Sequence, residues 1–194
     1  MSKLVKILAF NGSLRADSWN YKLVRIAGQG AEQAGAEVSY LHLNELPMPL
    51  FSEELEAEQG MPPNAKKFKE LLKAHDGFLI ASPEYNSSIT AALKNAIDWA
   101  SRAEPGDAML AAFKGKTALI MSASPGALGG LRGLVHLRAI LGNISVMVLP
   151  EQHALIQAHK QFDSDGKLVD EEIQEKILGL GRRLTEVCAK LIRE

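Results

Sequence analysis

The amino-acid sequence predicts an α/β fold in which a doubly wound, five-stranded parallel sheet carries helices on both faces. Short apolar runs alternate with helical patterns from one end of the chain to the other, and this alternation is typical of parallel sheets. Most runs are apolar on both sides, as strands covered on both faces require. No repeat, low-complexity tract or linker interrupts the pattern, so we expect residues 1–194 to form one domain.

The first half of the chain supplies three of the expected strands. LVKILAF has the composition of a buried strand, and EVSYLHL alternates as a strand does. Phe68, Leu71 and Leu72 fall on one face of a helix. Strands are expected at 4–10, 37–43 and 77–83, and helices at 18–34, 64–75 and 89–101. The proline-containing segment 44–63 is expected to be a connection with an acidic patch.

The second half supplies the other two strands and the last helix. Strands are expected at 116–123 and 144–150, and a helix at 130–141. Apolar residues at spacings of three and four indicate the last helix, namely Ile173, Ile177, Leu180, Leu184, Val187 and Leu191. Cys188 shares this apolar flank and is interpreted as core filler, not as a reactive thiol. DSDGK at 163–167 lacks the downstream glutamate of a calcium loop, which favours a surface turn.

Composition argues against several classes of function. The formal net charge of −1 gives no electrostatic grip on nucleic acid or anionic lipid. No apolar run approaches the roughly 20 residues of a membrane helix, and the N-terminal one leads into a glycine turn instead of a signal-peptide cleavage site. The single cysteine excludes an internal disulfide, so we expect a cytoplasmic protein. The five histidines are scattered without metal-ligand spacing, and no metal site is predicted.

Three unusual loops follow the first, third and fourth expected strands. They are GSLRADSWN at 12–20, SPEYNSS at 82–88 and SASPGALGG at 122–130. Ligands of open α/β sheets bind beyond the carboxyl ends of the strands, and these ends share one edge of a parallel sheet. We therefore expect the three loops to form a single binding site.

The first loop has the composition of a phosphate seat. Ser13, Ser18 and Asn20 offer neutral hydrogen-bond donors, and Arg15 offers a fork that matches phosphate oxygens. The plainer interpretation is a turn in which Asp17 or Ser18 caps the next helix. The loop is neither a GxxxxGK[ST] motif nor a GxGxxG motif, which favours a monophosphate over a pyrophosphate.

The other two loops suit a flat ligand. The second loop provides Pro83, Glu84, Tyr85 and Asn86, whose backbone and aromatic ring are able to lie along such a ligand; its plainer interpretation is a helix start capped by Ser87 or Ser88. The third loop provides Ser124, Gly126, Gly129 and Gly130, with amides that are suited to a heterocycle. Its plainer interpretation is a flexible loop. Together the loops predict a pocket for a planar mononucleotide.

The ordered set of motifs resembles the NADPH-dependent FMN reductase family. The motifs are G-S-L-R-x-x-S-x-N, P-E-Y-N and S-x-S-P-G-x-L-G-G, and LPMPLF, LKNAIDWASR and LRAIL extend the match over roughly residues 4–150. This family belongs to the flavodoxin-like superfamily and includes bacterial quinone and chromate reductases. The resemblance implies a flavodoxin-like fold that binds FMN.

The resemblance also implies roles for individual residues. It assigns the FMN phosphate to Ser13, Arg15, Ser18 and Asn20, the isoalloxazine and ribityl edge to Pro83, Glu84, Tyr85 and Asn86, and the pyrimidine end to Ser124, Gly126, Gly129 and Gly130. Thr90-Ala91 stands where family members often carry Pro-Gly, which alters the loop over the flavin. Arg132 is left open between contact with a nicotinamide nucleotide phosphate, contact with a neighbouring subunit, and an ordinary solvated side chain.

The implied activity is hydride transfer from NADPH or NADH through bound FMN to an acceptor. Quinones are the expected acceptors, with chromate, nitro or azo compounds and free flavin as others, and no side chain is expected to be catalytic. The exposed Leu50-Phe51 pair and the resemblance suggest a homodimer or homotetramer. The alternatives are a flavodoxin-type electron carrier, which usually needs a strongly charged face, and an FMN-binding redox sensor.

Overall fold

The computed structural model describes residues 3–192 and contains a five-stranded parallel sheet with the strand order β2-β1-β3-β6-β7. Its strands are β1 (Lys6–Asn11), β2 (Glu37–His42), β3 (Gly77–Ala81), β6 (Thr117–Ala123) and β7 (Met147–Leu155). The chain order of the strands reverses between β1 and β3, as in the flavodoxin-like arrangement. The predicted fold class is therefore confirmed, and that residues 1–194 form one domain stays a prediction.

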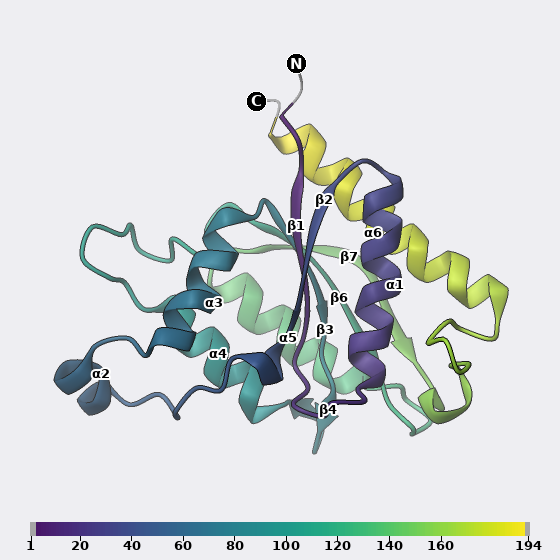
Figure 1. Cartoon of the computed structure of the whole chain (residues 1–194), viewed down its shortest axis with the longest axis horizontal. Helices are drawn as coiled ribbons and strands as arrows, with labels where there is room; N and C mark the ends of the chain where they lie inside the picture. Colours follow the sequence, from purple (N-terminus) through teal and green to yellow (C-terminus); the bar gives the residue numbers. More distant parts are fainter. Residues whose placement is uncertain (1–2, 193–194) are drawn as a thin grey trace.

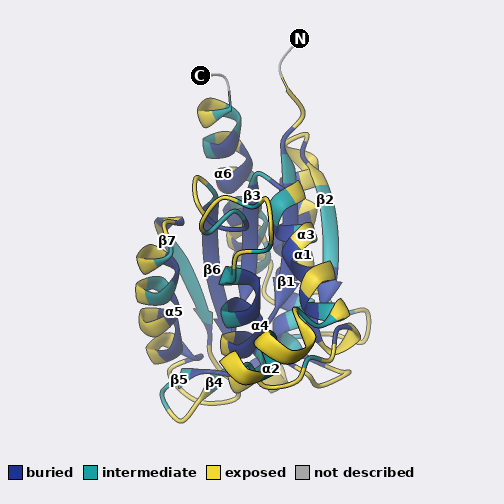
Figure 2. Ribbon diagram, turned by 90° about the vertical axis from the view of Figure 1, so that its left-hand side faces the viewer, coloured by how far each residue is buried: buried dark blue, intermediate teal, exposed yellow. Residues whose placement is uncertain are grey.

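Helices cover both faces of the sheet (Figure 1). They are α1 (Trp19–Gln33), α2 (Glu53–Gln59), α3 (Pro63–Ala74), α4 (Ala91–Ser101), α5 (Leu131–Asn143) and α6 (Glu171–Leu191), with short 3-10 turns at Leu43–Glu45 and Ala158–Lys160. Helices α1 and α6 pack on one face, and α3, α4 and α5 pack on the other, which gives two apolar clusters separated by the sheet. Figure 2 shows the central strands buried between helices whose outer sides are exposed, while the edge strands β2 and β7 are only partly buried.

The structure shows which residues cap α1 and α4, one as the sequence allowed and one not. Ser18, not Asp17, caps α1 by accepting a hydrogen bond from the Tyr21 amide. Thr90 caps α4, so the prediction of Ser87 or Ser88 as the cap is wrong. The chain forms a small antiparallel hairpin there, β4 (Glu84–Tyr85) and β5 (Ser88–Ile89), before α4 begins.

The fifth strand begins and ends later than the expected range of 144–150. It runs over Met147–Leu155 and continues past Pro150, which the sequence analysis took as its end. The register to β6 shifts between Ala118 and Ile120, so β7 bulges where Pro150 lies. A proline is tolerated there because β7 is an edge strand and a bulge leaves an amide position unpaired.

Helices α1 and α6 approach each other through glycines. A Cβ atom on Gly181 of α6 would lie 1.8 Å from the Ala27 carbonyl oxygen, and one on Gly30 of α1 would lie 1.9 Å from the Leu178 carbonyl oxygen. The backbones therefore touch directly, and this contact joins the last helix to the first (Figure 1).

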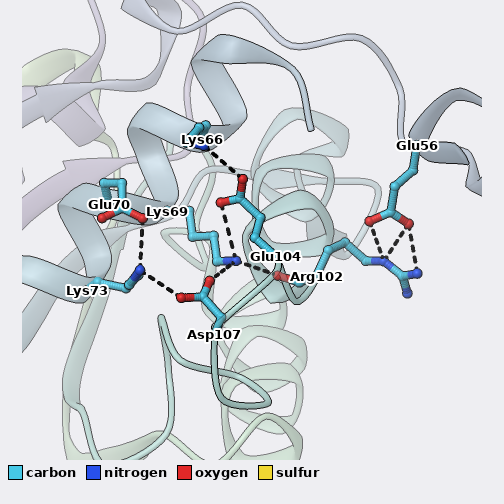
Figure 3. A network of polar contacts seen from close by, with 8 residues as sticks. All are labelled: Glu56, Lys66, Lys69, Glu70, Lys73, Arg102, Glu104 and Asp107. Atoms are coloured by element: carbon cyan, nitrogen blue, oxygen red, sulfur yellow. Dashed lines mark hydrogen bonds and ion pairs between the residues drawn. The ribbon is translucent and has the colours of Figure 1, made fainter. Parts of the chain in front are cut away.

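A network of charged residues anchors the segment after α4 (Figure 3). The Lys69 side chain of α3 is 1% exposed, and its ammonium lies 2.5 Å from an Asp107 carboxylate oxygen and 2.8 Å from the Arg102 carbonyl oxygen. Lys73 donates to the other Asp107 oxygen at 2.9 Å. The Arg102 guanidinium pairs with Glu56 of α2 at 2.8 Å. Since α2 has no buried residue, this pair is a principal tie between α2 and the rest of the fold.

The structure also bears on the expectations for Cys188, the 163–167 segment and the Leu50-Phe51 pair. Cys188 is buried in the core as predicted, and burial raises the pKa of its thiol to about 11. The 163–167 segment is a turn in which Asp163 accepts two backbone hydrogen bonds. Phe51 is half-buried against Trp99, so of the Leu50-Phe51 pair only Leu50 is fully exposed. Among residues 3–192, no helix combines the length and apolar character that crossing a bilayer requires.

Candidate functional site

A cavity of about 100 Å³ lies beyond the carboxyl ends of β1, β3 and β6, where the three unusual loops meet. It is lined by Ser13, Arg15, Ser18, Trp19, Asn20, Pro83, Glu84, Tyr85, Ala123, Ser124 and Pro125. The three loops therefore meet at one cavity as expected, and that they bind a ligand there stays a prediction. The cavity has room for a phosphate group and its nearest atoms, so a larger ligand extends from it over the outer parts of the loops.

The first loop presents a positive charge and two buried serines to this cavity. Ser13 is 3% exposed and Ser18 is 4% exposed. Their hydroxyl oxygens accept from the Arg15 and Tyr21 amides at 3.2 Å and 3.3 Å, so each hydroxyl hydrogen is left as a donor for a ligand. The Arg15 guanidinium stacks over the Trp19 ring at 5.1 Å. Asp17 is paired with Lys22 at 2.6 Å, and this contact lowers the pKa of Asp17. The carboxylate is thereby neutralised, which leaves Arg15 available to an anion.

The start of α1 adds backbone donors to the same place. Ser18 uses its hydroxyl to cap the Tyr21 amide at 3.3 Å, so the earlier first-turn amides of Trp19 and Asn20 remain for a ligand. The positive end of the helix dipole reinforces them. A helix start, an arginine and buried hydroxyls around a small cavity fit a phosphate group.

Asn20 lines the cavity and also ties α1 to β6. Its Nδ2 donates to the Ala123 carbonyl oxygen at 2.8 Å, and its Oδ1 accepts from the Ala123 amide at 2.9 Å. These two hydrogen bonds hold α1 against the loop that follows β6. A primary amide nitrogen carries two hydrogens, so the second hydrogen is left for a ligand, and the phosphate contact of Asn20 stays a prediction.

Glu84 lines the cavity, and its carboxylate is bound by the start of α5. Its carboxylate accepts from the Arg132 guanidinium at 2.7 Å and from the Gly133 amide at 3.1 Å. Burial alone raises the pKa of Glu84, but these two contacts outweigh it and lower the pKa below its usual range. Arg132 is therefore not an unpaired side chain, and at 58% exposure it remains accessible to a nucleotide phosphate or a neighbouring subunit, which stay predictions. The pair fastens the β4–β5 hairpin to the start of α5.

The rest of the second loop is open to ligands. Pro83 is buried at the cavity wall, and Tyr85 is 55% exposed with its ring at the rim. Asn86 and Ser87 adopt positive φ angles of 49° and 68°, a strained geometry for such residues that forms the tight hairpin turn. Asn86 is exposed and does not line the cavity itself.

Packing explains two of the three predicted glycines in the third loop. Gly129 and Gly130 have φ angles of 62° and 92°, and a Cβ on either would come within 3.0 Å of β7 backbone or of the Ser122 side chain. Only Ser124 of the four predicted residues lines the cavity, while Gly126 is exposed beside it. The Ser124 hydroxyl accepts from the Gly126 amide at 3.2 Å.

Several residues of the site were not predicted from the sequence. Trp19, Ala123 and Pro125 line the cavity, and each is a neighbour of a predicted residue in the chain. Asn11 and His42, which are buried polar residues behind the first loop, were also not predicted, and Thr90 was noted only as a departure from Pro-Gly. Their signal was position, since Asn11 and His42 are the last residues of β1 and β2, at the ligand-binding edge.

A family comparison gives this geometry a biochemical assignment. The family model for NADPH-dependent FMN reductases matches residues 5–160. The chain belongs to this family. Membership makes the protein an oxidoreductase that binds FMN and uses NAD(P)H, and the phosphate seat of the first loop fits the FMN phosphate. Within residues 3–192, no three or more His, Cys, Asp or Glu side chains are grouped so as to hold a metal ion.

Individual relatives agree with this family. An NAD(P)H-dependent FMN reductase of Pseudomonas aeruginosa is 37% identical over 178 residues, which covers 91% of this chain and 91% of that protein. The quinone reductase of Escherichia coli strain K12 is 33% identical over 185 residues, which cover 92% of this chain and 93% of that protein. One similar solved structure is that of FerB, a flavoenzyme NAD(P)H:(acceptor) oxidoreductase from Paracoccus denitrificans. It has a TM-score of 0.79 and 28% sequence identity, and the match covers 96% of this chain and 98% of that chain.

Proposed function

We propose that this FMN reductase family member transfers electrons from NADPH or NADH to quinones by way of FMN seated at the three-loop site. The observation that carries the proposal is the convergence of a phosphate seat, an aromatic turn and a glycine-rich loop at one edge of the sheet. The E. coli relative is named a quinone reductase, which supports quinones as the acceptors. Chromate, nitro or azo compounds and free flavin are proposed as further acceptors.

The first loop holds the phosphate end of the cofactor. Arg15 provides the fixed charge, Ser13 and Ser18 provide hydroxyls, and the first-turn amides of α1 complete the seat. Asn20 contributes by fixing α1 to β6. Trp19 keeps the Arg15 guanidinium stacked and so limits the orientations it samples.

The second and third loops hold the flat part of the cofactor. Pro83, Glu84, Tyr85 and Asn86 form one wall through their backbone and the tyrosine ring, and Ser124, Gly126, Gly129 and Gly130 form the loop at the pyrimidine end. The Glu84–Arg132 pair keeps this wall rigid. When bound, FMN supplies the hydride chemistry that side chains cannot perform. The protein's part is to position the ring and leave one face open to NAD(P)H and then to the acceptor, so no catalytic side chain is needed.

The site is proposed to work in a homodimer or homotetramer in the cytoplasm. Next to the first loop lies an apolar groove of about 420 Å³ that includes Leu14, Pro47, Met48 and Leu50. Leu14 is 57% exposed and Leu50 is 77% exposed, and apolar side chains gathered beside a site are typical of an interface. The single buried cysteine suits a reducing compartment.

Anaerobic visible spectroscopy tests the proposed function. NADPH or NADH should bleach the FMN-loaded protein, and benzoquinone should restore the oxidised spectrum with steady-state turnover. Arg15→Gln should weaken FMN binding by about tenfold or more, because a charge-assisted phosphate contact is lost. Arg25→Gln, which removes a charge on α1 outside the cavity, should leave the FMN dissociation constant unchanged.

Three results would count against parts of this proposal. If FMN does not bind, the assignment of the three loops to the cofactor fails. If the bound FMN stays oxidised with both nucleotides, the redox-sensor alternative replaces the enzyme. If it is reduced once but does not turn over with quinones, the electron-carrier alternative does.

A further inference from the structure

The carbonyl groups of the first loop are held by buried side chains that do not line the cavity. Thr90 Oγ1 donates to the Gly12 carbonyl at 2.6 Å, Asn11 Nδ2 donates to the Ser13 carbonyl at 3.4 Å, and His42 Nε2 lies 2.9 Å from the Arg15 carbonyl. The donors are 3%, 0% and 5% exposed. They come from three different elements, the start of α4 and the ends of β1 and β2.

This arrangement matters because the loop surrounds a seat for an anion. Each peptide unit carries a donor and an acceptor, and an anion is attracted to the N–H and repelled by the C=O. A loop of this length is able to present either group to its concave side. Donors on the core side of the loop bind the carbonyl oxygens and so fix the orientation of the peptide planes. The acceptor oxygens therefore face the core and not the cavity.

We propose that Asn11, His42 and Thr90 are positioning residues that select the phosphate-binding conformation of the 12–18 loop. This inference rests on the proposed function, in which that loop holds the FMN phosphate. The three residues contribute to phosphate affinity without touching the ligand. They act on the loop through the carbonyls of Gly12 and its neighbours.

The two partners of His42 define what its ring does. A carbonyl oxygen only accepts, so Nε2 carries the hydrogen toward Arg15, and Nδ1 accepts from the Asn44 amide at 3.4 Å. The Tyr21 ring packs against the imidazole with centroids 4.6 Å apart. The ring is therefore held from both edges and one face, which makes it a rigid donor.

Thr90 joins the loop to α4 with one hydroxyl. Its Oγ1 accepts from the Leu93 amide at 3.1 Å as the cap of α4 and donates to Gly12. A Cβ on Gly12 would lie 2.9 Å from Leu93 side-chain atoms, so the loop begins in direct contact with α4. A proline at position 90 has neither a hydroxyl nor an N–H, so the sequence departure at Thr90-Ala91 creates a contact that Pro-Gly lacks.

The test compares the dissociation constants of FMN and riboflavin, which differ only in the phosphate. Thr90→Val and His42→Asn each remove one donor, and Asn keeps an acceptor near the Nδ1 position of His42. Each should raise the FMN dissociation constant about three- to tenfold, as loss of one buried hydrogen bond implies, and change that of riboflavin less than twofold. Thr90→Ser and His42→Gln place a donor back near the carbonyl and should restore wild-type FMN binding.

Matched control variants separate positioning from general loss of stability. The side chains of Thr185 and His75 are also buried and form hydrogen bonds to backbone carbonyl oxygens, but neither residue lines the cavity at the three loops. Thr185→Val and His75→Asn should leave the ratio of the two dissociation constants at its wild-type value even where they lower Tm. If the variant at Thr90 or at His42 fails to fold, the variant at the other residue tests the proposal.

The outcomes distinguish this inference from the proposed function. A wild-type protein that prefers FMN to riboflavin, with a ratio unchanged in Thr90→Val and His42→Asn, overturns the inference alone. Parallel weakening of both ligands in these variants also overturns it. A wild-type protein that binds riboflavin as tightly as FMN overturns the phosphate seat itself.

Discussion

The fold controls the charge state of Asp107 through two lysines. Hydrogen bonds from Lys69 and then Lys73 lower its pKa from 3.8 to about 2. In the unfolded chain the carboxyl takes up a proton at a higher pH than in the folded protein, so its stabilising contribution is essentially complete above about pH 5 and is lost as the pH falls from there toward 2. The stabilisation comes from the contacts of Asp107 with Lys69 and Lys73 in the charged network of Figure 3.

Asp107→Asn tests this pH dependence. The variant should be less stable than wild type at pH 7, and the difference in unfolding free energy should shrink steadily between about pH 5 and pH 3. Urea unfolding at a series of pH values measures it. Asp98→Asn removes only a more exposed ion pair with Lys94 on α4. Its unfolding free energy should differ little from that of wild type. A constant difference for Asp107→Asn across this range would contradict the assigned role.

At the same scale, the sequence predicted residue types better than side-chain partners. Ser13, Arg15 and Ser18 lie at the cavity as expected, because their place in the loop is fixed by the end of β1. Asn20 and Glu84 carry equally suitable polar groups, yet they bind Ala123 and Arg132. Those partners are about 103 and 48 residues away in the chain, and no local pattern reports such a contact.

Among the elements, the α1–α6 pair depends on the absence of a side chain at Gly181. Gly181→Ala would place a Cβ against the Ala27 carbonyl oxygen and force the two helices apart, at a cost of about 2 kcal/mol or more in unfolding free energy. Gly179→Ala lies in the same helix, where the nearest atom is the flexible Arg182 side chain at 3.7 Å, and should be neutral or stabilising by up to about 1 kcal/mol. Urea unfolding of both variants measures the contrast, and equal stabilities would refute the close packing.

The elements that the sequence predicted well are those with a strong apolar period. The spans of α1, α3 and α6 follow directly from their spacing of apolar residues. The β4–β5 hairpin is only two residues per strand, and α2 has no buried face, so neither carries a periodic signal. Pro150 was misleading because a bulge on an edge strand accommodates it.

For the whole molecule, the fold and the position of the site follow from one argument. Alternating strands and helices require a parallel sheet, and its carboxyl ends share an edge, so loops 12–20, 82–88 and 122–130 had to meet. The contacts that hold this edge rigid, such as Thr90 to Gly12, link elements that are distant in the chain. Their geometry depends on the packed sheet and is therefore absent from any local pattern.

The assembly state is the remaining property at this scale, and the apolar groove beside the first loop predicts it. Light scattering should give a dimer or tetramer for the wild-type protein. Leu50→Asp should yield monomers, because Leu50 is 77% exposed at the groove and a carboxylate there is costly to bury. Met109→Asp, at an 81% exposed residue outside the groove, should leave the assembly intact. A monomeric wild-type protein, or a Leu50→Asp variant that stays oligomeric while folded by circular dichroism, would show that this groove is not the interface.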